Sequence, residues 1–225
     1  GMEWKHTVLF QNLNRPTNEN IRTNLLRLQP LPISALHNQK IEEIYSSRFQ
    51  YFNPMQTMTF HSLYNANSSV FVGSPTGSGK TVVAELALFH AFKKFPGLKV
   101  VYIAPMKALV RERVDDWRKR LCGNKLPTKL KLVELTGDSL PEARDVRQAD
   151  IIVTTPEKFD GISRNWQTRK FVQQVSLVIM DEVHLLASDR GPILEMIVSR
   201  MNYISEQRRK AQNGSSENDI RLLGM

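Results

Sequence analysis

Residues 74–81 read Ser-Pro-Thr-Gly-Ser-Gly-Lys-Thr, a combination of residue types that can bind phosphate. The stretch follows the apolar run 70–72 and precedes the helix-like apolar run 82–88. A strand, a glycine-rich turn and a helix start in this order direct backbone N–H groups and the positive end of the helix dipole at one point. Lys80 can then reach the phosphates, and the Thr81 hydroxyl can ligate Mg²⁺. The residues predicted to contact a nucleotide here are Pro75, Thr76, Gly77, Ser78, Gly79, Lys80 and Thr81.

Two acidic residues, Asp181 and Glu182, follow the apolar run 177–180. Such a strand places carboxylates beside the phosphate-binding loop, where Asp181 is predicted to hold Mg²⁺ directly or through water. Glu182 is predicted to orient and deprotonate the attacking water, since phosphoryl transfer requires mainly charge neutralisation and positioning. The alternative for this pair is a helix N-cap with an acidic first turn. His184 has no second His or Cys at ligand spacing, so we do not expect it to bind metal.

The elements that must position these residues alternate between strand-like and helix-like runs. Val- and Ile-rich strands without polar alternation indicate a parallel sheet covered by helices on both faces, an α/β fold whose ligands lie beyond the carboxyl ends of the strands. Expected strands are 70–72, 99–104, 130–135, 150–154, 177–180 and 220–223, and expected helices are 35–48 (capped by Ser34), 54–64, 82–95, 107–121, 142–148, 166–174 and 192–204. We expect the polar segment 205–219 to be a mobile surface loop.

Gln56 falls in the first turn of the helix expected at 54–64. Its amide both donates and accepts, so it can pair with the amino group and N7 of adenine. A solvated surface glutamine is the alternative.

The composition of the 225 residues, 41% of them hydrophobic, favours one large α/β domain. We expect residues 1–50 to form an N-terminal strap and short helix that lead into a nucleotide-binding domain at 51–225. The net charge of +9 favours a polyanionic partner such as nucleic acid, although a solvated basic surface is the alternative. The single cysteine, Cys122, excludes an internal disulfide and a cysteine zinc cluster. No apolar run approaches the length of a membrane span, so we expect no membrane partner.

Together, residues 74–81, Gln56 and the Asp-Glu-Val-His sequence at 181–184 resemble the first RecA-like P-loop domain of superfamily-two helicases. The spacing agrees, since Asp181 follows Lys80 by 101 positions. Runs 104–109, 135–138 and 154–160 resemble the nucleic-acid-contacting motifs of that family. Further runs are similar to the tandem-cassette, Ski-like DExH-box helicases: 28–36, 52–57, 110–113 and 189–195. The strap before the domain resembles the segment that enters their second cassette. The run 107–113 favours the signal-cointegrator branch over the U5 snRNP branch.

The resemblance implies ATP and Mg²⁺ as cofactors, with Lys80, Asp181 and Glu182 catalytic and with Thr81 and Asp181 as metal ligands. It implies that Gln56 reads adenine and that His184 couples the nucleotide site to the nucleic acid. A single nucleic-acid strand would be contacted along its backbone by Pro105, Lys107, Thr136, Gly137, Thr155, Pro156 and Lys158. It further implies 3′-to-5′ polarity, with another cassette and further subunits as partners. A location in the nucleus and one in the cytoplasm both suit this chemistry.

Three alternatives stay open at this point. A degenerate cassette could serve as a protein-interaction scaffold, although Lys80, Thr81, Asp181 and Glu182 are all intact. A U5 snRNP-type RNA helicase is the second alternative. A DNA translocase or repair helicase is the third, because backbone-contacting motifs do not separate RNA from DNA. The family places a second RecA-like domain, with its arginine finger, after this segment. We therefore expect the isolated chain to bind nucleotide but to hydrolyse it hardly at all.

Overall fold

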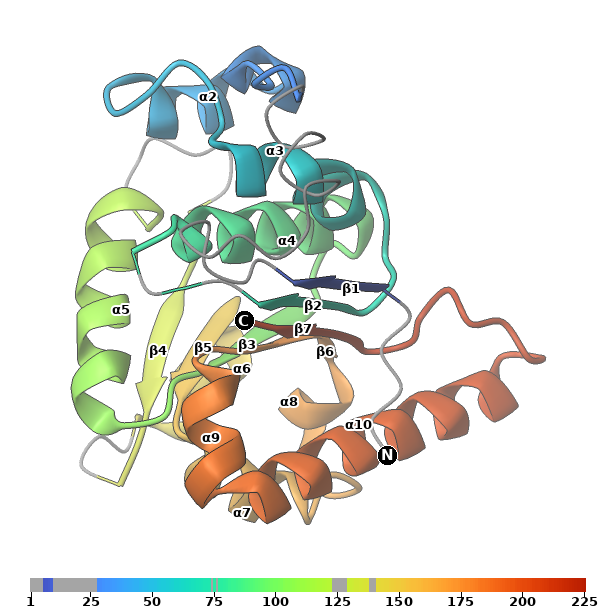
Figure 1. Ribbon diagram of the computed structural model, residues 1–225. Helices are drawn as coiled ribbons and strands as arrows, with labels where there is room; N and C mark the ends of the chain where they lie inside the picture. Colours follow the sequence, from blue (N-terminus) through green and yellow to red (C-terminus); the bar gives the residue numbers. More distant parts are fainter. Residues whose placement is uncertain (1–5, 10–27, 74, 76, 123–128, 138–140) are drawn as a thin grey trace.

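The computed structural model describes residues 6–9, 28–73, 75, 77–122, 129–137 and 141–225. Within these residues a single sheet of seven strands has the order β1-β2-β7-β6-β3-β5-β4, and each neighbouring pair is parallel (Figure 1). The strands are β1 His6–Leu9, β2 Val70–Gly73, β3 Lys99–Ile103, β4 Leu132–Leu135, β5 Ile151–Thr154, β6 Val175–Met180 and β7 Arg221–Gly224. The predicted parallel α/β sheet is therefore confirmed.

Helices cover both faces of this sheet, with α2 to α5 on one side and α6 to α10 on the other (Figure 1). They are α2 Gln39–Ser46, α3 Pro54–Phe60, α4 Lys80–Lys94, α5 Lys107–Arg120, α6 Ala143–Gln148, α7 Pro156–Ser163, α8 Lys170–Gln173, α9 Val183–Asp189 and α10 Gly191–Ala211. A 3₁₀ turn, η1 Ile33–Leu36, and a π-helical turn, η2 His61–Asn65, complete the described elements. No helix among the described residues is both long and apolar enough to cross a membrane.

The central strands explain why the sequence lacks polar alternation. All six residues of β6 are buried, with Leu177 and Ile179 in the core beneath α2 to α5 and Val178 and Met180 in the core beneath α6 to α10. A strand with an apolar core on each face carries apolar side chains at consecutive positions, as residues 177–180 do here.

The register of the strands brings their carboxyl ends to one edge of the sheet. Ile103 of β3 pairs with Met180 of β6 and with Thr154 of β5, which in turn pairs with Leu135 of β4. On the other side of β6, Met180 pairs with Gly224 of β7. Residues that follow these strands therefore lie along one edge, as predicted.

Several predicted boundaries were wrong. Helix α2 begins at Gln39 and is capped by Asn38, whose side chain accepts from Ile41 N at 3.3 Å, whereas Ser34 lies in the separate turn η1. Within the segment predicted as a helix at 166–174, only α8 is helical, and residues 166–168 form turns. Helices α7 and α9 were not predicted.

The segment predicted as a loop at 205–219 is also partly helical, because α10 continues to Ala211. The buried Ser205 hydroxyl accepts a hydrogen bond from Ile220 N at 2.8 Å, and Arg208 donates to the carbonyl of Val175 at 2.9 Å. Arg209 pairs with Asp219 at 2.8 Å. Tertiary contacts thus hold a polar stretch in helical form. Within the predicted strap 1–50, residues 6–9 form β1, which extends the sheet beside β2.

Candidate nucleotide-binding site

The phosphate-binding loop lies between β2 and α4, as the sequence predicted. Gly77 and Gly79 have φ angles of 81° and 87°, a left-handed conformation that glycine adopts without strain. The Ser78 hydroxyl donates to the carbonyl of Pro75 at 2.6 Å, which closes the turn. Helix α4 begins at Lys80, so its first N–H groups face the loop. Thr76 and Ser74 lie outside the described residues.

Helix α3 supports this loop through a pair of amides. Asn53 and Gln56 form a capping box, in which Asn53 Oδ1 accepts from Gln56 N at 2.8 Å and Gln56 Oε1 accepts from Asn53 N at 2.9 Å. The remaining amide nitrogens reach the loop: Gln56 Nε2 donates to Gly79 O at 3.2 Å, and Asn53 Nδ2 donates to Ser78 O at 2.8 Å. Gln56 is buried, and its predicted contact with adenine stays a prediction.

Lys80 and Glu182 meet at the end of the loop. Lys80 Nζ lies 3.4 Å from Glu182 Oε1, and both side chains are largely buried. The ammonium makes no hydrogen bond with any described residue. A buried cation without hydrogen-bond partners is costly, and phosphate oxygens would satisfy it. Glu182 itself has a φ of 54°, a left-handed conformation that a residue other than glycine adopts at an energetic cost, and such strain is concentrated at functional sites.

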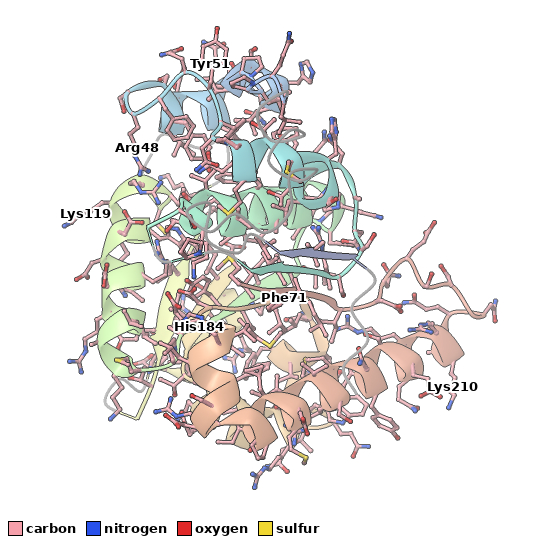
Figure 2. All side chains as sticks on the ribbon, in the orientation of Figure 1. Arg48, Tyr51, Phe71, Lys119, His184 and Lys210 are labelled. Carbon is pink, nitrogen blue, oxygen red and sulfur yellow. The ribbon has the colours of Figure 1, made fainter. Side chains whose placement is uncertain are left out.

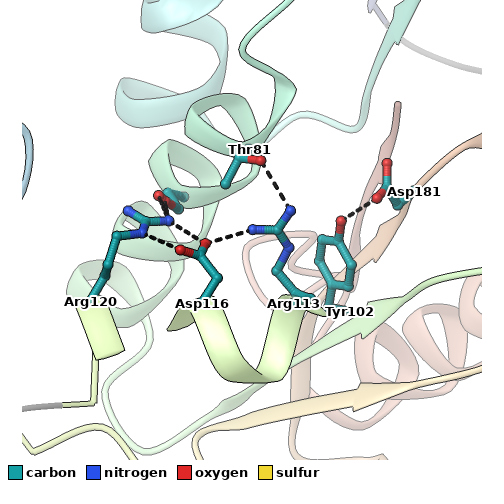
Figure 3. Close-up of polar contacts among 7 residues, drawn as sticks. Thr81, Tyr102, Arg113, Asp116, Arg120 and Asp181 are labelled. Atoms are coloured by element: carbon teal, nitrogen blue, oxygen red, sulfur yellow. Dashed lines mark hydrogen bonds and ion pairs between the residues drawn. The ribbon is translucent and has the colours of Figure 1, made fainter. Parts of the chain in front are cut away.

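The two predicted metal ligands each contact a side chain that the sequence did not single out (Figure 3). Arg113 Nη2 of α5 donates to Thr81 Oγ1 at 3.1 Å. The Tyr102 hydroxyl of β3 donates to Asp181 Oδ2. Burial, followed by the charge of Asp181, raises the pKa of Tyr102 well above its usual value, so this hydroxyl remains a donor.

The side chains that the structure describes at this site are too few to hold a metal ion alone. Among the described residues no group of three or more His, Cys, Asp or Glu side chains is placed to bind one. Mg²⁺ is usually held by one or two carboxylates together with the phosphates of a nucleotide. One hydroxyl, Thr81, and one carboxylate, Asp181, beside a phosphate-binding loop therefore fit a nucleotide-dependent Mg²⁺ site.

His184 lies in the first turn of α9, at the same edge of the sheet (Figure 2). Its Nε2 lies 3.2 Å from Glu182 Oε2, and its side chain is 60% exposed. The backbone around it is fixed by the end of β7, since Val183 N donates to Met225 O at 2.8 Å and Met225 N donates to Met180 O at 2.9 Å. An exposed ring in contact with the predicted base suits a role in coupling the nucleotide site to the nucleic acid, and this role stays a prediction.

The residues predicted to contact nucleic acid follow three strands that are neighbours in the sheet, β3, β5 and β4. Lys107 is exposed, and its Nζ would lie 3.6 Å from a Cβ at Gly137, so the ammonium passes over that glycine. Lys158 is half-buried. The other members of the set, Pro105, Thr136, Thr155 and Pro156, are buried. The structure thus brings the set together, with two lysines as its accessible cations.

Arg190 joins two of these motifs and was given no role by the sequence. Its Nη1 donates to the carbonyl of Pro105, and its Nε lies 3.1 Å from Glu157 Oε1. The ends of β3 and β5 are therefore linked by one guanidinium at the start of α10. The only sequence signal for it was its place in the run 189–195.

Other basic side chains project from separate elements, as Arg48, Lys119 and Lys210 do in Figure 2. Arg48 follows α2, Lys119 lies on α5 and Lys210 lies near the end of α10, and all three are exposed. The net charge of +9 alone therefore does not locate a nucleic-acid surface.

The likeness of this fold to solved structures is clear. The DEAD-box helicase Mss116 bound to ssRNA and UDP-BeF aligns with a TM-score of 0.66 and 20% identity, covering 88% of this chain and 41% of that one. The DUF1998 helicase MrfA bound to DNA aligns with a TM-score of 0.64 and 18% identity, covering 87% of this chain and 27% of that one. These likenesses support the predicted RecA-like fold.

Sequence relatives define the family more narrowly. Over all 225 residues the chain is 68% identical to "RQC trigger complex helicase SLH1" of Saccharomyces cerevisiae, of which it covers 11%. It is 51% identical to "Activating signal cointegrator 1 complex subunit 3" of Homo sapiens, of which it covers 10%. These identities confirm the predicted resemblance to the signal-cointegrator branch of the Ski-like helicases. The profile of the DEAD/DEAH box helicase family matches residues 53–215, and the chain therefore belongs to that family.

Proposed function

We propose that this chain is the ATP-binding lobe of a 3′-to-5′ nucleic-acid helicase, within the second cassette of a protein of the signal-cointegrator type. The observation that carries the proposal is the buried Lys80 ammonium, which faces Glu182 at 3.4 Å and lacks a hydrogen-bond partner among the described residues. It lies where β2, a glycine turn and the start of α4 meet, which is the arrangement that binds nucleotide phosphates.

The side chains divide the work of ATP hydrolysis. Backbone N–H groups of the loop and Lys80 would bind the phosphates, while Thr81 and Asp181 would hold Mg²⁺. Bound Mg²⁺ would neutralise charge on the phosphates. Glu182 would orient the attacking water and accept its proton, and the neighbouring Lys80 and His184 hold its carboxylate in place.

Nucleic acid would bind along the ends of β3, β5 and β4. Lys107 and Lys158 would meet phosphates of one strand, which suits recognition without sequence preference. The exposed His184 ring beside Glu182 would couple this surface to the nucleotide. The same proposal includes RNA or DNA as the bound strand and further subunits as partners. It also includes a location in the nucleus or the cytoplasm.

The test is thermal unfolding of the chain with and without Mg²⁺–ADP, in the wild type and in Lys80→Ala. A ligand that binds only the folded state at about 100 times its Kd stabilises that state by about 2.7 kcal/mol. We expect a rise in the midpoint that Lys80→Ala abolishes. Lys93→Ala is the matched control, because Lys93 is an exposed lysine at the other end of α4.

The outcomes separate the functions. A midpoint that rises in the wild type and in Lys93→Ala but not in Lys80→Ala supports the nucleotide site. A wild type without any rise would contradict nucleotide binding by this lobe and would favour a scaffold role. An equal rise in all three proteins would place the nucleotide elsewhere on the chain.

A further inference from the structure

Helices α4 and α5 face one another with polar stripes at helical spacing. On α4, Thr81 and Glu85 are four residues apart, and on α5, Arg113, Asp116 and Arg120 follow at intervals of three and four, so each set shares one face of its helix. The contacts run without a break (Figure 3). Arg113 donates to Thr81 Oγ1 at 3.1 Å and pairs with Asp116 at 2.9 Å, while Arg120 pairs with Asp116 at 2.7 Å and with Glu85 at 2.9 Å.

A second contact connects this stripe to the other predicted metal ligand. The Arg113 guanidinium carbon lies 5.7 Å from the ring centroid of Tyr102 and 5.3 Å from that of Trp117. The two rings pack edge to face at 5.1 Å. Tyr102 in turn donates its hydroxyl proton to Asp181 Oδ2. One stacked arginine–tyrosine pair thus reaches Thr81 through one member and Asp181 through the other.

We propose that Arg113 and Tyr102 are positioning residues that set the geometry of Thr81 and Asp181 for Mg²⁺. The proposal rests on the nucleotide-binding function proposed above. A hydroxyl oxygen has two lone pairs, and the Arg113 N–H uses one of them, which leaves the second lone pair and the hydroxyl proton in restricted directions. On Asp181, Tyr102 holds Oδ2 while Glu182 N donates to Oδ1 at 2.9 Å, so the carboxylate plane is fixed from both sides.

The charges of the two polar stripes indicate that these residues orient the metal ligands rather than attract the metal ion. The two polar stripes add no net charge beside the site, because two guanidinium groups face two carboxylates: Arg113 and Arg120 pair with Asp116 and Glu85. Charge alone would make removal of Arg113 favour Mg²⁺, because a cation near the metal would be lost. Loss of orientation has the opposite sign, since removal of such outer partners typically weakens metal binding by about 10- to 100-fold. The direction of the effect therefore separates the two explanations.

The test measures ADP affinity by calorimetry in Mg²⁺ and again in EDTA, and compares the ratio of the two affinities. The variants are Arg113→Met and Tyr102→Phe, and the control is Arg118→Met, which removes an exposed arginine of the same helix. We expect the Mg²⁺-dependent gain in affinity to fall about tenfold in both variants, or to disappear where the wild-type gain is smaller than that. Affinity in EDTA, and the ratio in Arg118→Met, should remain at wild-type values.

Each other result counts against the inference. An unchanged or increased ratio in Arg113→Met and Tyr102→Phe overturns it, even where their thermal midpoints fall, because a merely structural role lowers stability without touching the metal dependence. Tyr102→Phe keeps the ring against Trp117, so it carries the test if Arg113→Met does not fold. A wild type that binds ADP without any gain from Mg²⁺ overturns this inference alone. A wild type that binds no ADP in either buffer overturns the proposed function as well.

Discussion

Replacing Gly79 by alanine should destabilise the phosphate-binding loop by two separate costs. Gly79 has a φ of 87°, and a side chain in that left-handed conformation costs about 1–2 kcal/mol. The added Cβ would lie 2.4 Å from Gln56 Nε2 and 2.9 Å from Asn53 Nδ2, so both amides must move. Their hydrogen bonds to Gly79 O and Ser78 O would then be lost, at about 1 kcal/mol each. We therefore expect a loss of about 3–4 kcal/mol in the free energy of unfolding.

Gly77→Ala provides a matched control within the same loop. Gly77 has a φ of 81°, but a Cβ there would meet no atom of the described residues within 4 Å, so only the backbone cost of about 1–2 kcal/mol applies. Both variants should be unfolded in urea without nucleotide, and in a Gln56→Ala background the extra cost of Gly79→Ala should shrink. Equal losses for the two glycine variants would refute the role assigned to Asn53 and Gln56.

Two further predictions concern buried groups away from the site. Arg221 is 2% exposed and donates to the carbonyls of Ser68 at 2.8 Å, Leu63 at 2.9 Å and Ser62. Arg221→Met removes the donor from all three carbonyls and should therefore cost about 2–4 kcal/mol in urea unfolding. A loss below about 1 kcal/mol would contradict this reasoning. Burial lowers the pKa of His90, whose Nδ1 lies 2.8 Å from Tyr64 O, so the unfolded chain takes up the proton first as the pH falls. Stability should therefore decline below about pH 6.5, less steeply in His90→Gln, and identical slopes between pH 7 and pH 5 would exclude His90 as a cause.

The sheet was predictable because its signal is local. Runs of Val and Ile at β3, β5 and β6 predict strands that are buried on both faces. The candidate functional residues follow the ends of these strands. The length of α10 was not predictable in this way. Its last turns are polar, and they remain helical because Ser205 and Arg208 bond to distant backbone groups. The local composition of a segment does not predict contacts with backbone groups that are distant in the sequence.

The same division applies to the site. The phosphate-binding loop and the acidic pair at 181–182 can be predicted from residue type and spacing. In the sequence, Tyr102 is not distinguished from the apolar residues of β3. Its partner Asp181 lies 79 positions away, and Arg113 lies 32 positions from Thr81. One signal was available, since a tyrosine within a buried strand must find a partner for its hydroxyl. The capping pattern of Asn53 and Gln56 was also readable, but not its second set of bonds to the loop.

Glu85 explains why α4 and α5 keep their relative position. It is fully buried one turn after Thr81, and burial raises its pKa, while Arg120 opposes that rise through its charge and two hydrogen bonds of 2.9 and 3.1 Å. Burial also acts to raise the pKa of Asp116, but Arg120 and Arg113 hold it below its usual value. A buried charge without its partner costs several kcal/mol. If α5 moved by one turn along α4, Glu85 would lose its guanidinium, and the same charge pairing therefore fixes the distance from Arg113 to Thr81.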